Sequence, residues 1–377
     1  MNRLKDIPLI SRSTWPLFFL MALGAGCMVY RFAMGLGAST HLSDSFPWGI
    51  WVGMDIFVGV ALAAGGFTLT AAIYIFNWKK YKPVARPAVL TAFLGYLLLV
   101  MGVIIDIGKP LSFWHPLVMW QYRSVLFEVV WCIALYTAVL AMEFSPALLD
   151  GAGMHGLASF MKNKLVLFPL VIAGVTLSFH HQSSLGNLFL IVPDKLHHLW
   201  YTPLIGLLYF LSAVAAGMAM VSFESIVSSW AFKRGYEVGI LRGLAKGSAV
   251  SLLIYLAVRF TDLAVRGNFP LMLEGSRASV LFFIEIMAGV IVPMLLLASA
   301  SREGPVGRIL GGQILVMAGV ILNRFDTNFL TQAAHGGSYF PSWMEIAITA
   351  GVISFGVFLY RIAVLRLEVF PSAEVQH

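Results

Sequence analysis

Long apolar segments alternate with short polar ones along this chain of 377 residues. A bilayer hydrocarbon core of about 30 Å requires about 20 helical residues. Each apolar segment except the fifth, which is marginal, is therefore long enough to predict a transmembrane helix. The ten segments are 15–36, 48–76, 87–107, 124–148, 164–179, 201–225, 247–265, 278–299, 306–323 and 343–365.

Composition supports an all-α integral membrane protein that forms a single domain over 1–377, in contact with the lipid bilayer. Apolar residues make up 59% of the chain and charged residues 11%, which no ordinary soluble domain of this length shows. Basic residues such as Lys79, Lys80 and Arg302 concentrate in alternate connecting segments. The positive-inside rule then predicts a multi-pass protein with both termini cytoplasmic. We expect its location to be the bacterial inner membrane. The net charge of +7 reflects this topology and predicts no nucleic-acid partner.

Short motifs recur in the same order in two parts of the chain. VIAGVTL at 171–177 returns as VMAGVIL at 316–322, and SVLF at 124–127 returns at 279–282. An even number of crossings separates the copies, which makes them parallel. The pattern predicts two tandem four-helix bundles, 48–179 and 201–323, with flanking helices at 15–36 and 343–365. Chance similarity among apolar residues is the alternative.

Several acidic residues lie inside the apolar segments, near the predicted outer face. A carboxylate at the centre of a bilayer costs roughly 2.5 to 3.5 kcal/mol, so it points to a function by default. The alternative is ion pairing, since Arg259 is three residues from Asp262 and Arg123 is close to Glu128. The candidate catalytic and binding residues of this outer group are Asp55, Asp106, Glu128, Arg259, Asp262, Glu285 and His181.

Further charged residues, Arg86, Glu143 and Glu224, lie at the inner ends of helices. Such residues often only anchor a helix at the interface. If they have a function, a path from Glu143 or Glu224 through Tyr96 towards Asp262, Glu285 and the other outer carboxylates suits proton transfer.

Histidines and cysteines give little support for a metal or a haem. Bis-histidine haem b needs imidazoles on facing helices at matched depth, and we expect the histidines at the outer edge, in the inner loop or in the tail. Cys27 and Cys132 are isolated, so no metal and no iron–sulfur centre is expected. A haem at the outer rim is the alternative. The histidines are His41, His115, His155, His180, His181, His197, His198, His335 and His377.

A quinone headgroup, from menaquinone or ubiquinone, fits the outer group best. Its two oxygens need hydrogen-bond donors, its two-electron chemistry needs groups that move protons, and its tail needs an apolar pocket. The outer segments 113–120 and 339–343 are rich in aromatic residues. They predict either interfacial anchors or a docking surface for a peripheral subunit.

Several motifs together resemble the NrfD/PsrC superfamily of membrane subunits, and in particular the membrane subunit of hydrogenase-2-type complexes. The motifs are FPWGIWVGMD (46–55), AAGGF (63–67), IDIG (105–108), SVLFE (124–128), MEFSPAL (142–148), HQSSLG (181–186) and YFPSW (339–343). Two positions depart from the expected pattern, since Lys109 stands where arginine is more usual and Asp262 where glutamate is.

The resemblance implies a haem-free, quinone-interacting anchor. It further implies a periplasmic ferredoxin-like iron–sulfur subunit, which relays electrons to or from a catalytic subunit such as a hydrogenase. The positions that the resemblance marks as functional are Asp55, Arg86, Tyr96, Glu128, Glu143, His181 and Glu224.

Two other functions remain open from the sequence. A secondary transporter or proton channel would also contain repeats and buried carboxylates, and would work without redox partners. Pro169 and Pro293 interrupt the fifth and eighth segments, but no pair of helices broken at the midplane is evident. The second alternative is a b-type cytochrome subunit, which the predicted positions of the histidines disfavour.

Overall fold

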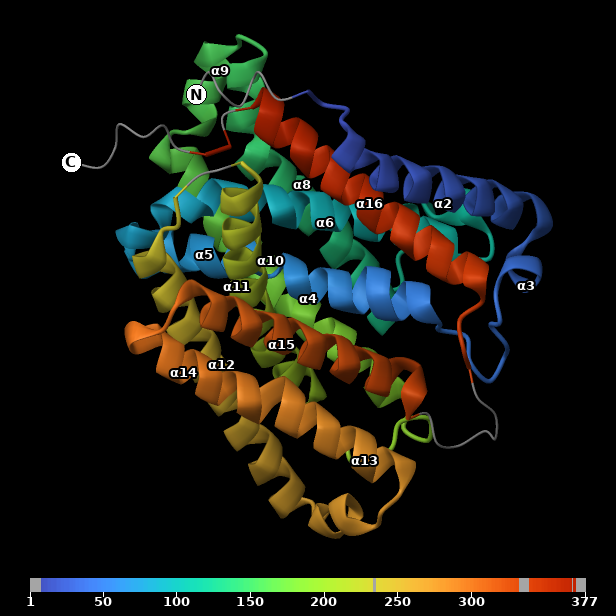
Figure 1. The fold of residues 1–377 in the computed structure, drawn as a ribbon. Coiled ribbons are helices and arrows are strands. Elements are labelled where there is room, and N and C mark those ends of the chain that lie inside the picture. Colours follow the sequence, from blue (N-terminus) through green and yellow to red (C-terminus); the bar gives the residue numbers. More distant parts are fainter. Residues whose placement is uncertain (1–7, 233–234, 332–338, 368, 371–377) are drawn as a thin grey trace.

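The computed structural model describes residues 8–232, 235–331, 339–367 and 369–370, and over these residues it is helical without strands. Ten helices are long and apolar enough to cross a membrane, as the sequence predicts. Figure 1 shows them packed side by side in one tilted array. The ten spans are α2 (Trp15–Met34), Trp51–Ile75, Lys79–Asp106 with α6 (Lys82–Asp106), α8 (Val125–Gly151), Lys164–Ile191 with α10 (Lys164–Asn187), α11 (Ile205–Ala231), α12 (Val238–Val265), Arg277–Glu303, Val306–Leu330 with α15 (Val306–Phe325), and α16 (Trp343–Arg366).

The first and last spans pair along their length, and the two ends of the described chain meet (Figure 1). Arg361 near the end of α16 donates hydrogen bonds to the carbonyl oxygens of Pro8 and Leu9, at 2.8 and 3.2 Å. We call this end of the helical array the terminal side and the opposite end the distal side. The short helix α9 (His155–Met161) also lies on the terminal side.

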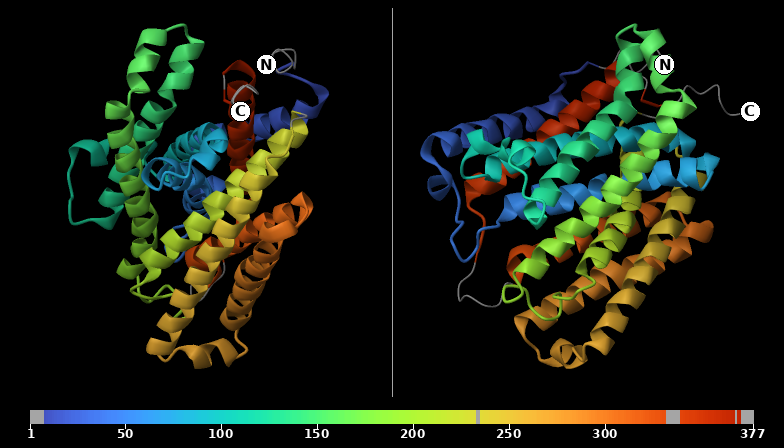
Figure 2. Two further views of the ribbon diagram at one scale, coloured as in Figure 1. Left: turned by 90° about the vertical axis from the view of Figure 1, so that its left-hand side faces the viewer. Right: turned by 180° about the vertical axis from the view of Figure 1, so that it is seen from behind.

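The central helix of the array is α11. It packs on α10, on α4 (Gly59–Ala63) and α5 (Gly65–Thr70) of the second span, and on α12 and α15. Helices α6, α8 and α10 pack in sequence on one side of it, and α12, α14 (Val292–Glu303) and α15 pack together on the other (Figure 2). These two groups of helices meet along α11 and where α15 contacts the second span.

Two pairs of glycines lie at close helix crossings, and one pair, Gly65 and Gly217, occupies matching positions of the predicted repeat. The backbones of Gly65 and Gly217 are so close that a Cβ on Gly217 would lie 2.4 Å from the amide nitrogen of Gly65. A Cβ on Gly319 would lie 2.3 Å from Cα of Gly289, so neither crossing has room for a side chain. Small residues of this kind let helix backbones approach in a membrane protein. These contacts agree with a tandem repeat, which itself remains a prediction.

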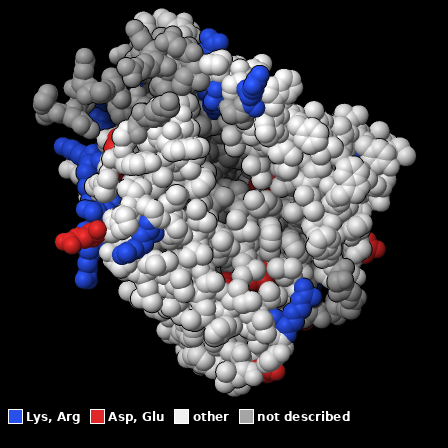
Figure 3. Space-filling view, in the orientation of Figure 1, with Lys and Arg blue, Asp and Glu red and all other residues white. Residues whose placement is uncertain are grey.

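Lysines and arginines on the visible surface lie mainly near its edges, and a few acidic atoms are visible near its centre (Figure 3). In the orientation of Figure 1, most visible lysines and arginines gather along the left and upper edges, near the terminal side, and most of the remaining face is uncharged (Figure 3). Large apolar side chains are exposed on the outer helices, for example Phe19 at 67% and Val29 at 69% on α2. An apolar belt of this kind suits lipid, because tails are as apolar as the side chains.

On the terminal side, the third and seventh spans begin at Lys79 and Val238 instead of residues 87 and 247. On the distal side, two spans extend further than the sequence predicts. The fifth reaches Ile191 instead of residue 179, and the ninth reaches Leu330 instead of residue 323. Both predictions stopped where polar residues interrupt the apolar run, at His180 and at Arg324. In the structure, polar residues after each of those points turn into the helix packing, so the helices continue past them.

Four π-helical segments interrupt the spans, and three of them hold a buried carboxyl group. Asp55 lies in η2 (Trp51–Val58), Glu285 in η8 (Glu285–Ile291) and Asp326 in η9 (Asp326–Leu330); the fourth is η3 (Ala71–Ile75). The end of η8 has a clear cause, because Pro293 has no N–H to donate. Such segments occur often at functional sites.

Candidate functional site

His181 is the most deeply buried candidate residue in the first half of the chain. Its side chain is fully buried, and neither ring nitrogen has a hydrogen-bond partner. The ring faces Tyr96 of α6 with 5.7 Å between centroids, and Tyr96 meets Tyr136 of α8 edge to face at 4.6 Å. The sequence placed His181 at the outer edge, which is wrong: ten more helical residues, about 15 Å, separate it from the end of its span.

A chain of buried polar groups leads from His181 towards the terminal side, and we call its five residues the His181 chain. It continues through the hydroxyls of Tyr96, Ser178 and Tyr136 to Glu143. Ser178 interacts with both tyrosines without reaching hydrogen-bond geometry. Gly174 makes room for the last member, since a Cβ at this position would lie 3.3 Å from Oε1 of Glu143.

The polar atoms of the His181 chain lack protein partners. The hydroxyls of Tyr96, Ser178 and Tyr136, both ring nitrogens of His181 and Oε1 of Glu143 are all buried without a hydrogen bond. An unsatisfied buried group costs about 1–3 kcal/mol, so ordered water or a ligand normally satisfies such groups. Three packed helices, α6, α8 and α10, supply this chain and enclose it.

Glu128 lies at the distal edge of the same helices. Its carboxylate is 3.1 Å from Nε2 of His180, and its Oε1 accepts a short hydrogen bond from Ser184. Ser184 is one turn after His181 on α10, so Glu128 bonds a residue one helical turn from the head of the His181 chain. Arg123, the partner that the sequence suggested, instead lies over the ring of Tyr122.

Asp55 and Asp106 come together between the second and third spans, close to α2 and α16. Asp55 accepts a hydrogen bond from Thr349 of α16 at 3.2 Å and interacts electrostatically with Asp106. Arg31 of α2 lies near Asp106 and donates to the carbonyl oxygen of Ile107 at 2.6 Å. Asp55 and Asp106 therefore form a pair that is separate from the His181 chain, with Arg31 as the nearby cation.

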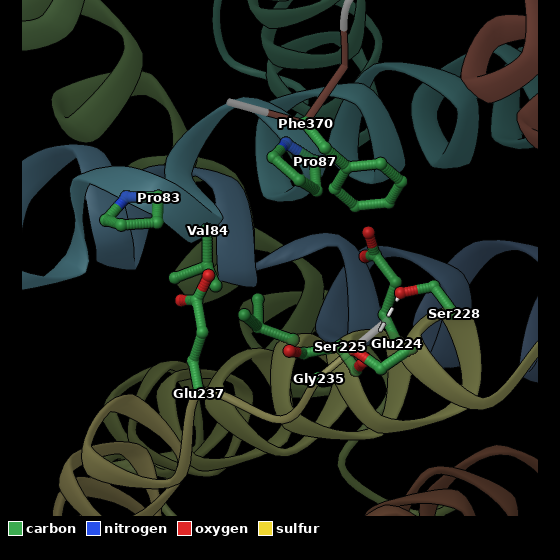
Figure 4. Close-up of a pocket in the computed structure, with 11 residues that line it drawn as sticks. Pro83, Val84, Pro87, Glu224, Ser225, Ser228, Gly235, Glu237 and Phe370 are labelled. Carbon is green, nitrogen blue, oxygen red and sulfur yellow. Dashed lines mark hydrogen bonds between the residues drawn. The ribbon is translucent and has the colours of Figure 1, made fainter. Parts of the chain in front are cut away.

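Residues predicted at the inner ends lie on the terminal side. Glu224 is 9% exposed and accepts hydrogen bonds from Thr91 at 2.6 Å and Tyr360 at 2.7 Å. It lines a pocket that also holds Glu237 and Phe370 (Figure 4). Arg86 and Glu143 both interact with Tyr74. Glu143 thus belongs to the His181 chain, and Glu224 belongs to a separate group.

Asp262 and Arg259 do not pair. Asp262 instead binds Arg266, whose guanidinium nitrogens lie 2.5 and 3.0 Å from Oδ2, and it accepts a hydrogen bond from Thr202 at 2.6 Å. The ion pair with Arg266 gives a structural reason for a buried carboxylate at Asp262. Arg259 lies over the ring of Phe282 at 5.3 Å, on the far side of α11 from the His181 chain, so the structure does not bring it to that chain.

Glu285 is the centre of a second buried polar group that the sequence located only in part. It accepts hydrogen bonds from Trp200, Tyr255 and Asn323. Arg324 and Asp326 lie beside it and were missed, because the apolar run ends before them. Their spacing after Glu285 carries no motif, so only the packing of the ninth span on the eighth reveals them.

Glu345 is a further buried carboxyl that the sequence did not identify. It is fully buried at the start of α16 and accepts hydrogen bonds from the hydroxyl of Tyr339 and from the amides of His41 and Ser342. A serine three residues before a glutamate is the signature of a capping box, and this signal was present in the sequence.

Comparison with known families decides the identity of the chain. The family model described as polysulphide reductase, NrfD, matches residues 38–332. The chain belongs to the NrfD family. The resemblance of its motifs to the NrfD/PsrC superfamily is thereby confirmed, and the multi-pass membrane architecture agrees with it.

Relatives cover nearly the whole of this NrfD protein. A protein of Nitratidesulfovibrio vulgaris is 37% identical over 93% of this chain and 92% of its own. The probable Ni/Fe-hydrogenase 2 b-type cytochrome subunit of Escherichia coli is 31% identical over 91% and 88%. The menaquinone reductase integral membrane subunit of Nitratidesulfovibrio vulgaris is 28% identical over 95% and 92%.

Histidine positions in this NrfD protein bear on haem. His181 is the one fully buried histidine among the described residues, whereas His41, His155, His180 and His198 are exposed; His335 and His377 lie outside the described residues. The described residues also contain no group of three or more His, Cys, Asp or Glu placed to hold a metal ion.

Proposed function

We propose that this NrfD protein is the quinone-interacting membrane subunit of a respiratory oxidoreductase complex. The observation that carries the proposal is His181, a fully buried imidazole with two unpartnered nitrogens at the head of a chain of unpartnered polar groups. Two relatives support it by name, the menaquinone reductase membrane subunit and the hydrogenase 2 subunit.

The residues at the distal edge of the first half fit a quinone headgroup. Glu128 and His180 are 40% and 59% exposed, so they are accessible from the edge of the helices, and Ser184 joins them to His181 one turn deeper. The orphaned nitrogens of His181 and hydroxyl of Tyr96 are donors or acceptors that still lack a partner. A bound quinone would supply two-electron redox chemistry with uptake or release of two protons.

The protein's own residues would move those protons. Glu128 and His180 hold the exposed edge, and His181 exchanges a proton between that edge and the interior, because one nitrogen of a neutral imidazole accepts while the other donates. Tyr96, Ser178 and Tyr136 connect His181 with Glu143. In this proposal Asp55, Asp106 and Arg31 form a neighbouring charged group, which sets the electrostatic potential near the quinone site. Arg86 and Glu224 have the same role on the terminal side.

Orientation and partners complete the proposal. The terminal side faces the cytoplasm of a bacterium, and the distal side faces the periplasm, where a ferredoxin-like iron–sulfur subunit docks and connects to a catalytic subunit. The aromatic segment 113–120 supports this, since Phe113 and Trp120 are 47% and 64% exposed there. Transfer along the His181 chain would then carry protons across part of the membrane. We propose no bis-histidine haem. Such a haem needs two buried imidazoles, and His181 is the one buried histidine among the described residues.

Binding of a quinol analogue tests the proposed site. The complex is purified in mild detergent, and quenching of the fluorescence of heptyl-hydroxyquinoline N-oxide is titrated for the wild type, His181→Ala and Glu128→Gln. Loss of one charge-assisted or buried hydrogen bond predicts binding about tenfold weaker, equal to about 1.4 kcal/mol. The control His198→Gln alters an exposed distal histidine and should bind like the wild type. Equal binding by all four proteins would exclude this site.

A further inference from the structure

The polar group around Glu285 forms a closed cluster in the second half of the chain, which we call the Glu285 cluster. Every member is less than one-tenth exposed, and the members come from four spans and the loop before α11. The cluster consists of Trp200, Tyr209, Tyr255, Arg259, Glu285, Asn323, Arg324 and Asp326. Two carboxyl groups and two guanidinium groups thus lie together, shielded from solvent and lipid.

The hydrogen bonds of Glu285 favour its ionised form. Its Oε2 accepts from the indole N–H of Trp200 at 2.7 Å, and its Oε1 accepts from the amide of Asn323 at 2.9 Å and the hydroxyl of Tyr255 at 3.3 Å. An ionised carboxylate offers about four acceptor positions and no donor. Three donors satisfy an ionised Glu285 and leave one acceptor position open.

Asp326, unlike Glu285, accepts no hydrogen bond on its side chain. Both of its carboxyl oxygens are buried, and no donor reaches either of them. The carboxyl of Glu285 is their neighbour, since Asn323, one turn before Asp326 on the same helix, donates to Glu285 and the two carboxyl groups interact electrostatically. Two adjacent buried carboxyl groups favour sharing one proton, because two ionised carboxylates would repel each other. With the proton on Asp326, ionised Glu285 keeps its three donors and gains the O–H of Asp326; with the proton on Glu285, ionised Asp326 would be buried with that single O–H as its donor, so the proton belongs on Asp326.

The arginines of the cluster do not neutralise Asp326 directly. Arg324 donates to Oδ1 of Asn323, to the carbonyl oxygen of Tyr209 and to Ser212, and it lies 3.6 Å over the ring of Tyr209. Arg259 faces the ring of Phe282, and its Nε and one terminal nitrogen have no partner. Arg277, outside the cluster, interacts with Asp326 electrostatically. A buried ionised aspartate would be expected to bind one of these guanidinium groups.

We propose that Asp326 and Glu285 form a proton-binding site, in which Asp326 carries a proton that it donates to ionised Glu285, and in which Arg259 becomes the counter-charge when the proton leaves. Arg259 suits this role because two of its nitrogens are uncommitted. The site is separate from the His181 chain and does not depend on the proposed quinone function.

The site also touches the first half of the chain. Asp326 begins η9, which packs on η2, the segment that holds Asp55. Within η9, Asn328 donates to the carbonyl oxygen of Gly49 at 2.9 Å, and Thr327 lies 2.5 Å from the hydroxyl of Tyr209. A change of charge at Asp326 therefore acts on a segment that both halves share.

Infrared spectroscopy of the full chain in lipid vesicles tests the proposal, because a protonated carboxyl has a C=O stretching band that ionised carboxylates lack. The wild-type spectrum minus that of Asp326→Asn should contain this band, shifted to lower frequency in D₂O. Asp194→Asn, at an exposed position, is the matched control and should remove no such band. A band that persists in Asp326→Asn, or that only Glu285→Gln removes, would overturn the assignment.

Two further measurements keep the proposal falsifiable if Asp326→Asn folds poorly. In Arg259→Met, without the counter-charge, the wild-type band should persist to a higher pH; an unchanged or lower pH contradicts the role of Arg259. Thermal unfolding of the wild type in sodium chloride and in choline chloride should agree. A stabilisation by sodium that Asp326→Asn lacks would show that the carboxyl pair binds a metal cation and not a proton.

Discussion

The hydroxyl of Tyr339 lies 2.5 Å from Oε1 of Glu345 and also accepts a hydrogen bond from the amide of Ile50 at 2.9 Å. This contact joins the segment before α16 to the start of the second span. The same carboxylate accepts from the amides of His41 and Ser342. Two distal regions far apart in sequence, 41–50 and 339–345, therefore depend on one buried glutamate.

Glu345→Ala should destabilise the protein by about 3 kcal/mol or more, because it leaves several buried donors without an acceptor. Tyr339→Phe should cost less, about 2 kcal/mol, since it removes the two hydrogen bonds of the hydroxyl and keeps the ring packed on Phe329. Thermal unfolding in detergent measures both. Glu303→Ala, at an exposed position of α14, is the control and should change little. Similar unfolding of all three variants would contradict this role of Glu345.

Removing the imidazole of His181 should separate stability from function. His181→Leu replaces a buried ring that makes no hydrogen bond, so we expect the unfolding temperature to be equal to that of the wild type or higher. Quinone-linked proton transfer in proteoliposomes should fall at least tenfold, because the chain from Glu128 to Glu143 loses its link. Loss of both stability and transfer would show that His181 is a packing residue.

Helix crossing at Gly289 and Gly319 should tolerate no side chain. Gly319→Ala places a Cβ 2.3 Å from the backbone of the partner helix, so the helices must separate, at about 1–3 kcal/mol. Gly311→Ala on the same helix has open space around it and should stabilise by up to about 1 kcal/mol through helix propensity. Opposite shifts in unfolding temperature are the expected result, and equal shifts would contradict the crossing.

Asp262 and Arg266 should be energetically coupled. Arg266→Gln leaves a carboxylate that is 5% exposed with Thr202 as its remaining donor, which predicts a loss of about 3 kcal/mol. Asp262→Asn in the same protein should restore part of this loss. A double-mutant cycle on unfolding should give a coupling energy above about 1 kcal/mol. Additive effects would show that the ion pair contributes nothing measurable.

A pH effect is expected at His197, in the distal loop before α11. Burial, and then repulsion by His198, lowers the pKa of His197, and its Nδ1 accepts a hydrogen bond from the amide of Leu199 at 3.2 Å. The unfolded chain then binds more protons than the folded one as pH falls below about 6.5, so stability decreases there. His197→Asn keeps an acceptor and does not titrate. Its unfolding temperature should fall less between pH 7 and pH 5 than that of the wild type.

Much of the fold could be predicted from hydropathy alone. All ten spans were expected, because the length of an apolar helix that crosses a bilayer is a strong physical constraint. The ends of the fifth and ninth spans were wrong for one reason: an apolar run ends at a polar residue, whether that residue faces lipid, water or another helix. His181, Asn323 and Arg324 face other helices, and this can be known only from the packing.

The acidic residues of the buried groups could be predicted from the sequence better than the partners that they contact. Intramembrane carboxylates singled out Asp55, Glu128 and Glu285 correctly as buried or partly buried groups, since their desolvation needs a reason. Their partners were less accessible to sequence reasoning. Three-residue spacing favoured Arg259 for Asp262, whereas the structure uses the four-residue spacing to Arg266.

The π-helical segments make chain length a property of the site as well as residue identity. Each turn of η2, η8 or η9 is wider than an α-helical turn, and deletion of a single residue there would return the segment to the narrower winding. The helix beyond the deletion would keep its orientation, because a π turn holds about one residue more than an α turn, but side chains within the segment would rotate by up to about 100° about the helix axis. Asp55, Glu285 and Asp326 would still be present in such a protein, yet no longer face the interior. Relatives that share every acidic residue but differ by one residue in these turns should therefore differ in chemistry.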